Sequence, residues 1–236
     1  KFFRKIRQKM LTENKFSKYL IYAIGEIILV VIGILIALSI NNWNQDRKDR
    51  ISEHKILNNI HRDFIQNKAS FDKLKVINYK NLATLDSIVE MLQEGVITIE
   101  KYNRYNKLIT GNTYNPYSST VNSVINSNSL ELIQDDELQK YLVSWKDVLA
   151  DYLEVETAYF KFINEQWRTY ILENSDWAGK NREMNIKALS SIKFRNHIMA
   201  KRALMNVIIK SIEEKPIENH INEIVRLTQP TTNDKI

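Results

Sequence analysis

Residues 19–43 read YLIYAIGEIILVVIGILIALSINNW, and this stretch decides the architecture of the chain. Its only charged side chain is that of Glu26. A helix needs roughly 20 apolar residues to cross the hydrocarbon core of a bilayer, and this stretch has that length. Tyr19 and Tyr22 stand near one end and Trp43 at the other, where amphipathic rings favour the lipid headgroups. The pattern predicts a transmembrane helix over 19–43 with these three rings as interfacial anchors.

The distribution of charge predicts how this helix is oriented. Seven of the 34 basic residues and one of the 28 acidic residues lie in residues 1–18, so this segment carries a net charge of +6 and the remainder is neutral. An excess of Lys and Arg beside a span keeps that side in the cytoplasm. We expect 1–18 to be a cytoplasmic basic amphipathic segment with membrane lipid as its partner. A nucleic-acid-binding arm would carry similar charge, but its position beside the span favours lipid and argues against nucleic acid.

The span also indicates an uncleaved signal anchor. A cleaved signal peptide has a shorter apolar region, followed by a small-residue cleavage site. Here the span has full length and ends in SINNWN, without an Ala-x-Ala pattern. The chain contains no Cys, so an exported domain would be stable without disulfides, and cysteine nucleophiles and thiolate metal sites are excluded.

The rest of the chain has a helical pattern. Only 5 Gly and 3 Pro occur, which argues against a loop-rich β fold. No Gly or Pro lies between 41 and 94, and the apolar residues there recur at helical spacing. This predicts a long helix ending at Gly95. Asn67, Asn78 and Asn81 interrupt the apolar stripe, so a bend or break in the seventies is open.

Further elements follow beyond Gly95. We expect short helices over 97–110 and 120–133 around a loop at 111–119, a long helix from an Asp135 cap to about 174, a turn at 175–183, and a helical region over 185–227 broken at Pro216. The fold class is therefore all-α, a transmembrane helix continuing into an elongated periplasmic antiparallel helical bundle. Its parts are the cytoplasmic segment 1–18, the span 19–43, the periplasmic helical domain 44–228 and a flexible tail 229–236.

No catalytic, metal or cofactor motif is found. The histidines His54, His61, His197 and His220 form no HExxH pair, and the glycines outside the span are isolated, so no phosphate-binding loop exists. No GxSxG sequence surrounds a serine. The sequence predicts a protein that is not an enzyme and needs no cofactor or metal.

Two features could bind a ligand or partner. An aromatic series on the long helix favours a core role over a ligand cage: Trp145, Tyr152, Tyr159, Phe162, Trp167 and Tyr170. The loop residues Tyr114, Asn115, Pro116 and Tyr117 are the candidate partner surface, because binding groups concentrate on loops held by rigid scaffolds.

Glu26 is the one residue of the span whose position needs a reason. An ionisable group in a membrane costs a few kcal/mol and usually faces protein or water. At helical spacing it shares a face with small residues that permit close helix approach, so this face is a candidate transmembrane contact: Ala23, Glu26, Val30, Gly33 and Ala37. The simpler alternative is that Glu26 extends towards Lys15 or Lys18.

Residues 2–44, FFRKIRQKMLTENKFSKYLIYAIGEIILVVIGILIALSINNWN, resemble the N-terminal signature of an uncharacterised single-pass inner-membrane family of Bacteroidota, a domain of unknown function. The matching motifs are FFRKIRQ, NKFSKY, AIGEI, VVIGILIAL and INNWN. Residues 121–145, VNSVINSNSLELIQDDELQKYLVSW, resemble a second landmark of that family, with Asn126 and Ser127 where Gly is common. The resemblance implies a bacterial inner-membrane protein with a periplasmic helical domain, and it brings no catalytic residues.

Three functions are consistent with these features. The first is a non-enzymatic, membrane-anchored periplasmic scaffold or interaction protein, either a homo-oligomer or an accessory to other envelope proteins. The second is a periplasmic ligand-binding sensor module, which would need a partner to relay its signal because so few residues precede the span. The third, ion-linked channel or motor accessory chemistry through Glu26, has the least support.

Overall fold

The computed structural model describes residues 15–176 and 178–230, apart from the side chains of 15–19 and 22. All regular secondary structure in this part of the chain is helical, which confirms the all-α class. The side chains of the predicted anchors Tyr19 and Tyr22, most of the basic segment 1–18 and most of the tail 229–236 lie outside what is described. Contacts divide the chain into two compact units that meet between His54 and Lys55. Each unit is described by itself.

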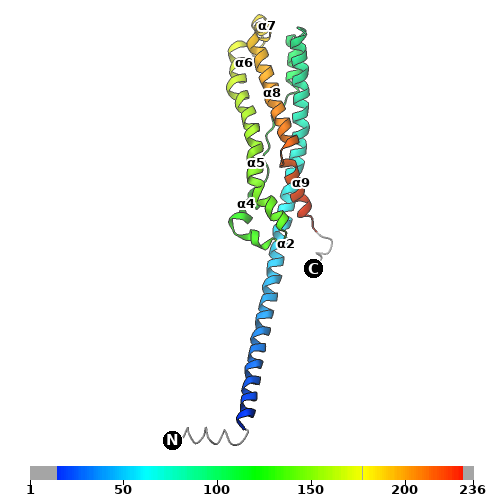
Figure 1. Ribbon diagram of the computed structural model, residues 1–236. Coiled ribbons are helices and arrows are strands. Elements are labelled where there is room, and N and C mark those ends of the chain that lie inside the picture. Colours follow the sequence, from blue (N-terminus) through cyan, green and yellow to red (C-terminus); the bar gives the residue numbers. More distant parts are fainter. Residues whose placement is uncertain (1–14, 177, 231–236) are drawn as a thin grey trace. The chain divides into compact units, whose positions relative to one another are not determined.

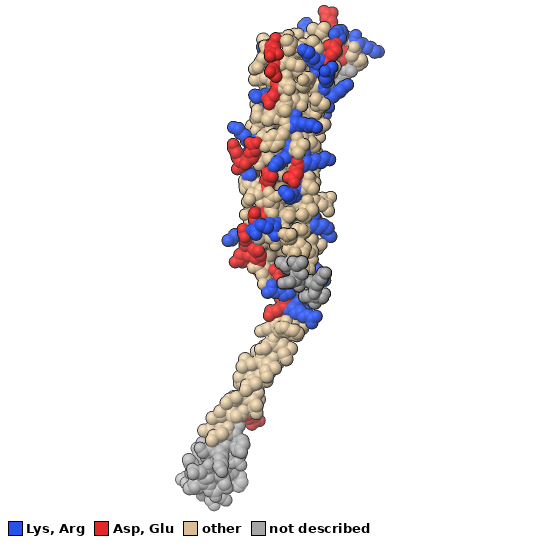
Figure 2. All heavy atoms as spheres, turned by 90° about the vertical axis from the view of Figure 1, so that its right-hand side faces the viewer, with Lys and Arg blue, Asp and Glu red and all other residues tan. Residues whose placement is uncertain are grey.

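The first unit consists of the N-terminal part of helix α2 (Lys15–Gln93). Within the described residues, α2 is the one helix long and apolar enough to cross a membrane. Its apolar side chains before Trp43 are exposed, and Trp43 itself is 66% exposed. Figure 2 shows this stretch as an almost uncharged surface, in contrast to the charged surface of the second unit. A helix of this composition is suited to lipid rather than to water.

Helix α2 continues without a break past Asn67, Asn78 and Asn81, so the break that was open in the seventies does not occur. It ends as expected at Gly95, which has φ +70°. The N–H of Val96 donates to the carbonyl of Met91 at 3.1 Å across this glycine. That is a Schellman end, in which a residue with positive φ satisfies the last carbonyls of a helix.

The second unit is a bundle in which long helices run side by side (Figure 1). Its further elements, in chain order, are α3 (Ile99–Asn106), α4 (Ser119–Asn126), η1 (Ser129–Leu132), α5 (Asp136–Phe162), η2 (Ile163–Trp167), α6 (Arg168–Asn174), α7 (Arg182–Ser190), α8 (Ile192–Glu214) and α9 (Ile217–Leu227). Helix α5 packs against α8 and α9, which run back along it. This is the antiparallel arrangement that the sequence predicts.

Local side chains explain most of these boundaries. The carboxylate of Asp135 accepts from the N–H of Leu138 at 2.9 Å, which confirms the predicted cap of α5. Pro216 separates α8 from α9, as expected. The region from 185 onward is not one helix before Pro216, however. It is divided at Ser191, whose extended backbone (ψ 146°) ends α7 and whose hydroxyl caps α8 at Phe194.

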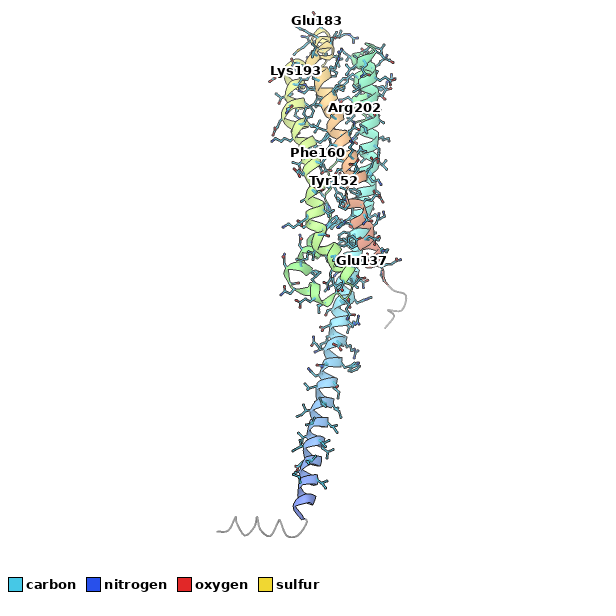
Figure 3. The ribbon with its side chains drawn as sticks, in the orientation of Figure 1. Glu137, Tyr152, Phe160, Glu183, Lys193 and Arg202 are labelled. Carbon is cyan, nitrogen blue, oxygen red and sulfur yellow. The ribbon has the colours of Figure 1, made fainter. Side chains whose placement is uncertain are left out.

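The core of the second unit forms two clusters. The larger cluster is built on aromatic rings in edge-to-face contact: Phe64 with Trp145 at 5.0 Å, and Phe71 with Tyr114 at 5.1 Å and with Tyr152 at 5.7 Å. Tyr152 points into the bundle (Figure 3). The smaller cluster includes the rings of Tyr102, Phe162, Trp167, Tyr170 and Phe194. The predicted aromatic series is therefore buried in these cores, where rings bury much apolar area in specific pairs.

Candidate functional site

A cavity of about 660 Å³ lies in the second unit. Its lining comes from α3, η2, α6, α7 and the N-terminal end of α8, and from the turn before α7, at the end of the bundle where α6 and α7 meet (Figure 1). The lining residues are Ile99, Tyr102, Asn103, Asn106, Ile163, Trp167, Arg168, Ile171, Ser175, Asp176, Gly179, Arg182, Asn185, Ala188, Leu189 and Phe194. Small-molecule sites have volumes of this order and mainly apolar walls.

Three buried rings form part of the wall. The rings of Tyr102 and Phe194 meet edge to face at 5.2 Å, and the ring of Trp167 lies 5.7 Å from that of Phe194. Burial raises the pKa of the Tyr102 phenol far above its usual value, so the phenol stays neutral. The wall is therefore apolar and aromatic.

Trp167 reaches the cavity because the α-helix changes to a π-helix over the five residues that end at Trp167. Residues Ile163–Trp167 form a π-helix, and Trp167 is followed at once by α6. Phe162 and Trp167 are five positions apart, and in an α-helix of 3.6 residues per turn these two side chains would face about 140° apart. The wider π-turn absorbs one residue and keeps both rings on the buried side. The step of five in an otherwise regular stripe was a sequence signal for this feature.

Some polar groups of the lining are already engaged. The Arg182 guanidinium pairs with Glu100 at 2.8 Å. The Asp176 carboxylate accepts from the N–H of Asn181 at 2.6 Å and of Ala178 at 2.9 Å, and these hydrogen bonds hold the pKa of Asp176 below its usual value. Asn185 bonds both the N–H and the carbonyl of Asp176. These groups stabilise the turn around Gly179 and are already engaged within the protein.

Other lining groups have no hydrogen bond or ion pair to any described residue: the side chains of Asn103, Asn106 and Arg168. A further cation lies close by. The Lys201 ammonium is 5.4 Å from the centroid of the Trp167 ring, and burial lowers the pKa of Lys201 to about 8. The cavity thus combines an aromatic wall with donors that are not satisfied within the protein.

The predicted partner loop is part of a longer non-helical segment, 109–118, which we call the strap. Two buried asparagines of α2 hold it. Asn81 donates to the Thr110 carbonyl at 2.8 Å and accepts from its N–H at 3.1 Å. Asn67 does the same for Tyr117, at 2.9 Å and 2.7 Å. Two of the three asparagines that interrupt the apolar stripe therefore satisfy the backbone of an extended segment, which a buried loop requires.

Each of these asparagine–backbone pairs is called a clamp, and the spacing of the two clamps follows from backbone geometry. Fourteen helical residues from Asn67 to Asn81 span about 21 Å at 1.5 Å each. Seven extended residues from Thr110 to Tyr117 span about 23 Å at 3.3 Å each. The strap therefore lies extended along α2 in the opposite direction, between the two clamps (Figure 1).

A third clamp comes from α5. Both carboxylate oxygens of Glu156 lie 3.1 Å from the backbone nitrogen of Tyr114, which donates to them, and the Tyr152 hydroxyl donates to Glu156 at 3.3 Å. Burial raises the pKa of Glu156, although these hydrogen bonds oppose the shift. Tyr114 is only 2% exposed, whereas Tyr117 is 55% exposed. Of the predicted partner residues, Tyr114 belongs to the core, and Asn115, Pro116 and Tyr117 remain accessible.

The predicted transmembrane face is fully accessible in the first unit: Ala23, Glu26, Val30, Gly33 and Ala37 are all exposed. The neighbouring residues of the span are exposed as well, so exposure does not distinguish this face from the others. The side chains of Lys15 and Lys18 are not described. Both interpretations of Glu26 therefore stay predictions.

None of the histidines is among the lining residues, although the ring of His197 lies 6.2 Å from that of Trp167. His61 pairs with Thr228 and His220 with Ser144, while His197 stacks on Tyr170 at 4.9 Å. Among the described residues, no group of three or more His, Asp or Glu lies close enough to hold a metal ion. The predictions of no metal, no cofactor and no enzymatic activity stay predictions.

A family model described as "Family of unknown function (DUF6090)" matches residues 26–208. This confirms the resemblance to an uncharacterised family, whereas its occurrence in Bacteroidota and the signature motifs stay expectations. No curated protein and no solved structure matches the chain.

Proposed function

Because the chain belongs to the DUF6090 family of unknown function, its role has to be inferred from its own residues, and we propose that it is a non-enzymatic, membrane-anchored helical interaction protein. In this proposal α2 anchors the chain in a bacterial inner membrane. The N-terminus is cytoplasmic and the helical unit is periplasmic. The basic residues concentrated before the span support this orientation.

The observation that carries the proposal is an exposed stripe on α2. Six exposed residues follow alternating steps of four and three: Ile65, Ala69, Asp72, Val76, Tyr79 and Ala83. All but Asp72 are apolar, small or aromatic, and Val76 is 64% exposed. This is the spacing by which one helix packs on another in a coiled coil. A stripe of this kind supports docking of a helix from a second copy or from another envelope protein.

The stripe continues towards α8. Tyr79 donates to Glu213 of α8 at 2.6 Å, so the stripe borders this helix. Helix α8 carries exposed apolar residues of its own: Ile192 at 75%, Met199 at 42% and Val207 at 47%. Figure 2, which views the α2 side of the bundle, shows uncharged surface between the charged side chains. Confinement to a membrane would raise the effective concentration of such surfaces and favour their association.

The test is the mass of the full chain after extraction in a mild detergent or in native nanodiscs, with mass spectrometry of any retained protein. We expect a species larger than the 27.8 kDa monomer. Val76→Glu places a charge in the stripe and should return the chain to the monomer. Ser70→Glu, at an exposed position about 120° around α2 from Val76, is the matched control and should leave the assembly intact. A wild-type chain that is monomeric and retains no other protein would refute the proposal.

A second candidate function, a ligand-binding module that relays through a partner, is supported by the cavity around Trp167. Its volume, aromatic wall and unsatisfied donors are those of a small-molecule site. The two functions are compatible, because the stripe and the cavity share no residue.

A further inference from the structure

The hydrogen-bonding groups that remain free in the cavity restrict the chemistry of its ligand. Arg168 offers a planar fork of N–H donors that matches a carboxylate. Asn103 and Asn106 lie three positions apart on α3 and offer amide donors and acceptors from the same wall. Asp176, the one carboxylate of the described lining, already accepts from two backbone N–H groups that stabilise the turn.

The apolar wall determines the chemistry of the part of the ligand that does not contact Arg168. Trp167 and Arg168 are consecutive, and the π-turn puts the indole in the aromatic wall while the exposed guanidinium follows at the start of α6. A molecule that touches both must therefore change from apolar to anionic within a few ångströms. The Lys201 ammonium beside the Trp167 ring adds positive charge to this region. A phosphate is a poorer match, because it carries more negative charge than a carboxylate and Arg168 is the one cation of the described lining without an ion pair, since Arg182 pairs with Glu100.

We propose that this cavity binds a small amphipathic carboxylic acid, with an apolar, ring-sized body against Tyr102, Trp167 and Phe194 and its carboxylate on Arg168. The proposal names the ligand class of the second candidate function and rests on that function alone. Its failure leaves the stripe on α2 untouched, because the stripe is tested by assembly and not by ligand binding.

The experiment is isothermal titration of the full chain in nanodiscs with 4-phenylbutyrate. The uncharged 4-phenylbutyramide is the matched ligand control, and empty nanodiscs are the reference for partition into lipid. Nanodiscs are needed because a detergent has the same amphipathic character as the probe. The variants are Arg168→Gln, which removes the charge, and Leu189→Trp, which fills the cavity. Arg195→Gln removes an exposed arginine of α8 outside the lining and is the protein control.

We expect 1:1 binding of the acid that is at least about tenfold weaker for the amide and for Arg168→Gln, since a charge-assisted pair is lost in each case. Arg195→Gln should bind as the wild type does, and Leu189→Trp should bind neither probe. Arg168 is exposed, so its variant folds even if the cavity-filling one does not. The proposal is overturned if neither probe binds. It is also overturned if the acid binds Arg168→Gln as tightly as the wild type, because the carboxylate then has another partner.

Discussion

Replacing Asn67 by alanine tests how the strap is held on the bundle. The change removes the two hydrogen bonds with Tyr117, at 2.9 Å and 2.7 Å, from a side chain that is 1% exposed. A hydrogen bond contributes about 1 kcal/mol net, and a buried group left without a partner costs about 1–3 kcal/mol. Tyr117 is half exposed, so water reaches its backbone in the variant. We therefore expect a loss of about 2 kcal/mol that is confined to the strap.

Hydrogen exchange measures this loss locally. At about 1.4 kcal/mol per factor of ten, 2 kcal/mol corresponds to roughly 30-fold faster exchange. The readout is deuterium uptake of peptides covering 109–118 in the full chain in nanodiscs. Asn58→Ala is the matched control, since Asn58 is an exposed asparagine of the same helix. Asn81→Ala should act in the same way from the Thr110 end.

Two results would contradict this account of the strap. One is exchange in 109–118 that rises less than about threefold in both variants, which would mean that other contacts hold the segment. The other is an equal rise in every helix of the bundle, which would mean that the asparagines stabilise the whole unit rather than the strap.

Three further changes test buried and capping groups by thermal unfolding of the full chain. Glu156→Gln keeps an acceptor for the N–H of Tyr114. Because burial raises the pKa of Glu156 in the folded chain, the contribution of this carboxyl to wild-type stability falls as pH rises above about 4.5. The stability of the variant relative to the wild type should therefore grow with pH, and a pH-independent difference would refute the buried charge. Lys201→Met removes an ammonium whose pKa burial lowers to about 8 in the folded chain, below its usual value of 10.5. This variant should raise Tm at pH 7 by a gain that shrinks between pH 8 and 10.5, and a lower Tm at pH 7 would oppose this reasoning. Asp135→Ala removes the cap of α5 and should cost about 1 kcal/mol, with Asp135→Asn close to wild type, whereas equal losses would point to the charge instead.

The parts of the fold that depend on neighbouring residues could be predicted from the sequence. The Asp135 cap, the end of α2 at Gly95 and the break at Pro216 each follow from the chemistry of one or two residues. The all-α class follows from scarce Gly and Pro and from apolar spacing. These signals act within one or two turns of a helix, so the local sequence contains them.

The parts that depend on distant residues could not be predicted. Asn67 and Asn81 looked like interruptions because their partners lie 50 and 29 positions away, on the strap. The cavity likewise forms where α3, α6 and α7 meet, and no sequence motif indicates that meeting. Ser191 divides α7 from α8 although no Gly or Pro stands there, because its hydroxyl can cap the next helix.

The π-turn at Ile163–Trp167 also has a consequence for how the chain can change in length. It contains one residue more than an α-helix needs, so deleting Asn164 or Gln166, both exposed, would leave a continuous α-helix from α5 to α6. Phe162 and Trp167 would then be four positions apart, about 40° around an α-helix, so Trp167 and Tyr170 would stay on the face that Tyr152 and Tyr159 share. The deletion would therefore shorten the chain and leave the aromatic cluster at this end of the bundle in place. We expect this position to tolerate substitution or loss of one exposed residue, whereas the same deletion in the regular part of α5 would turn every following side chain by about 100°.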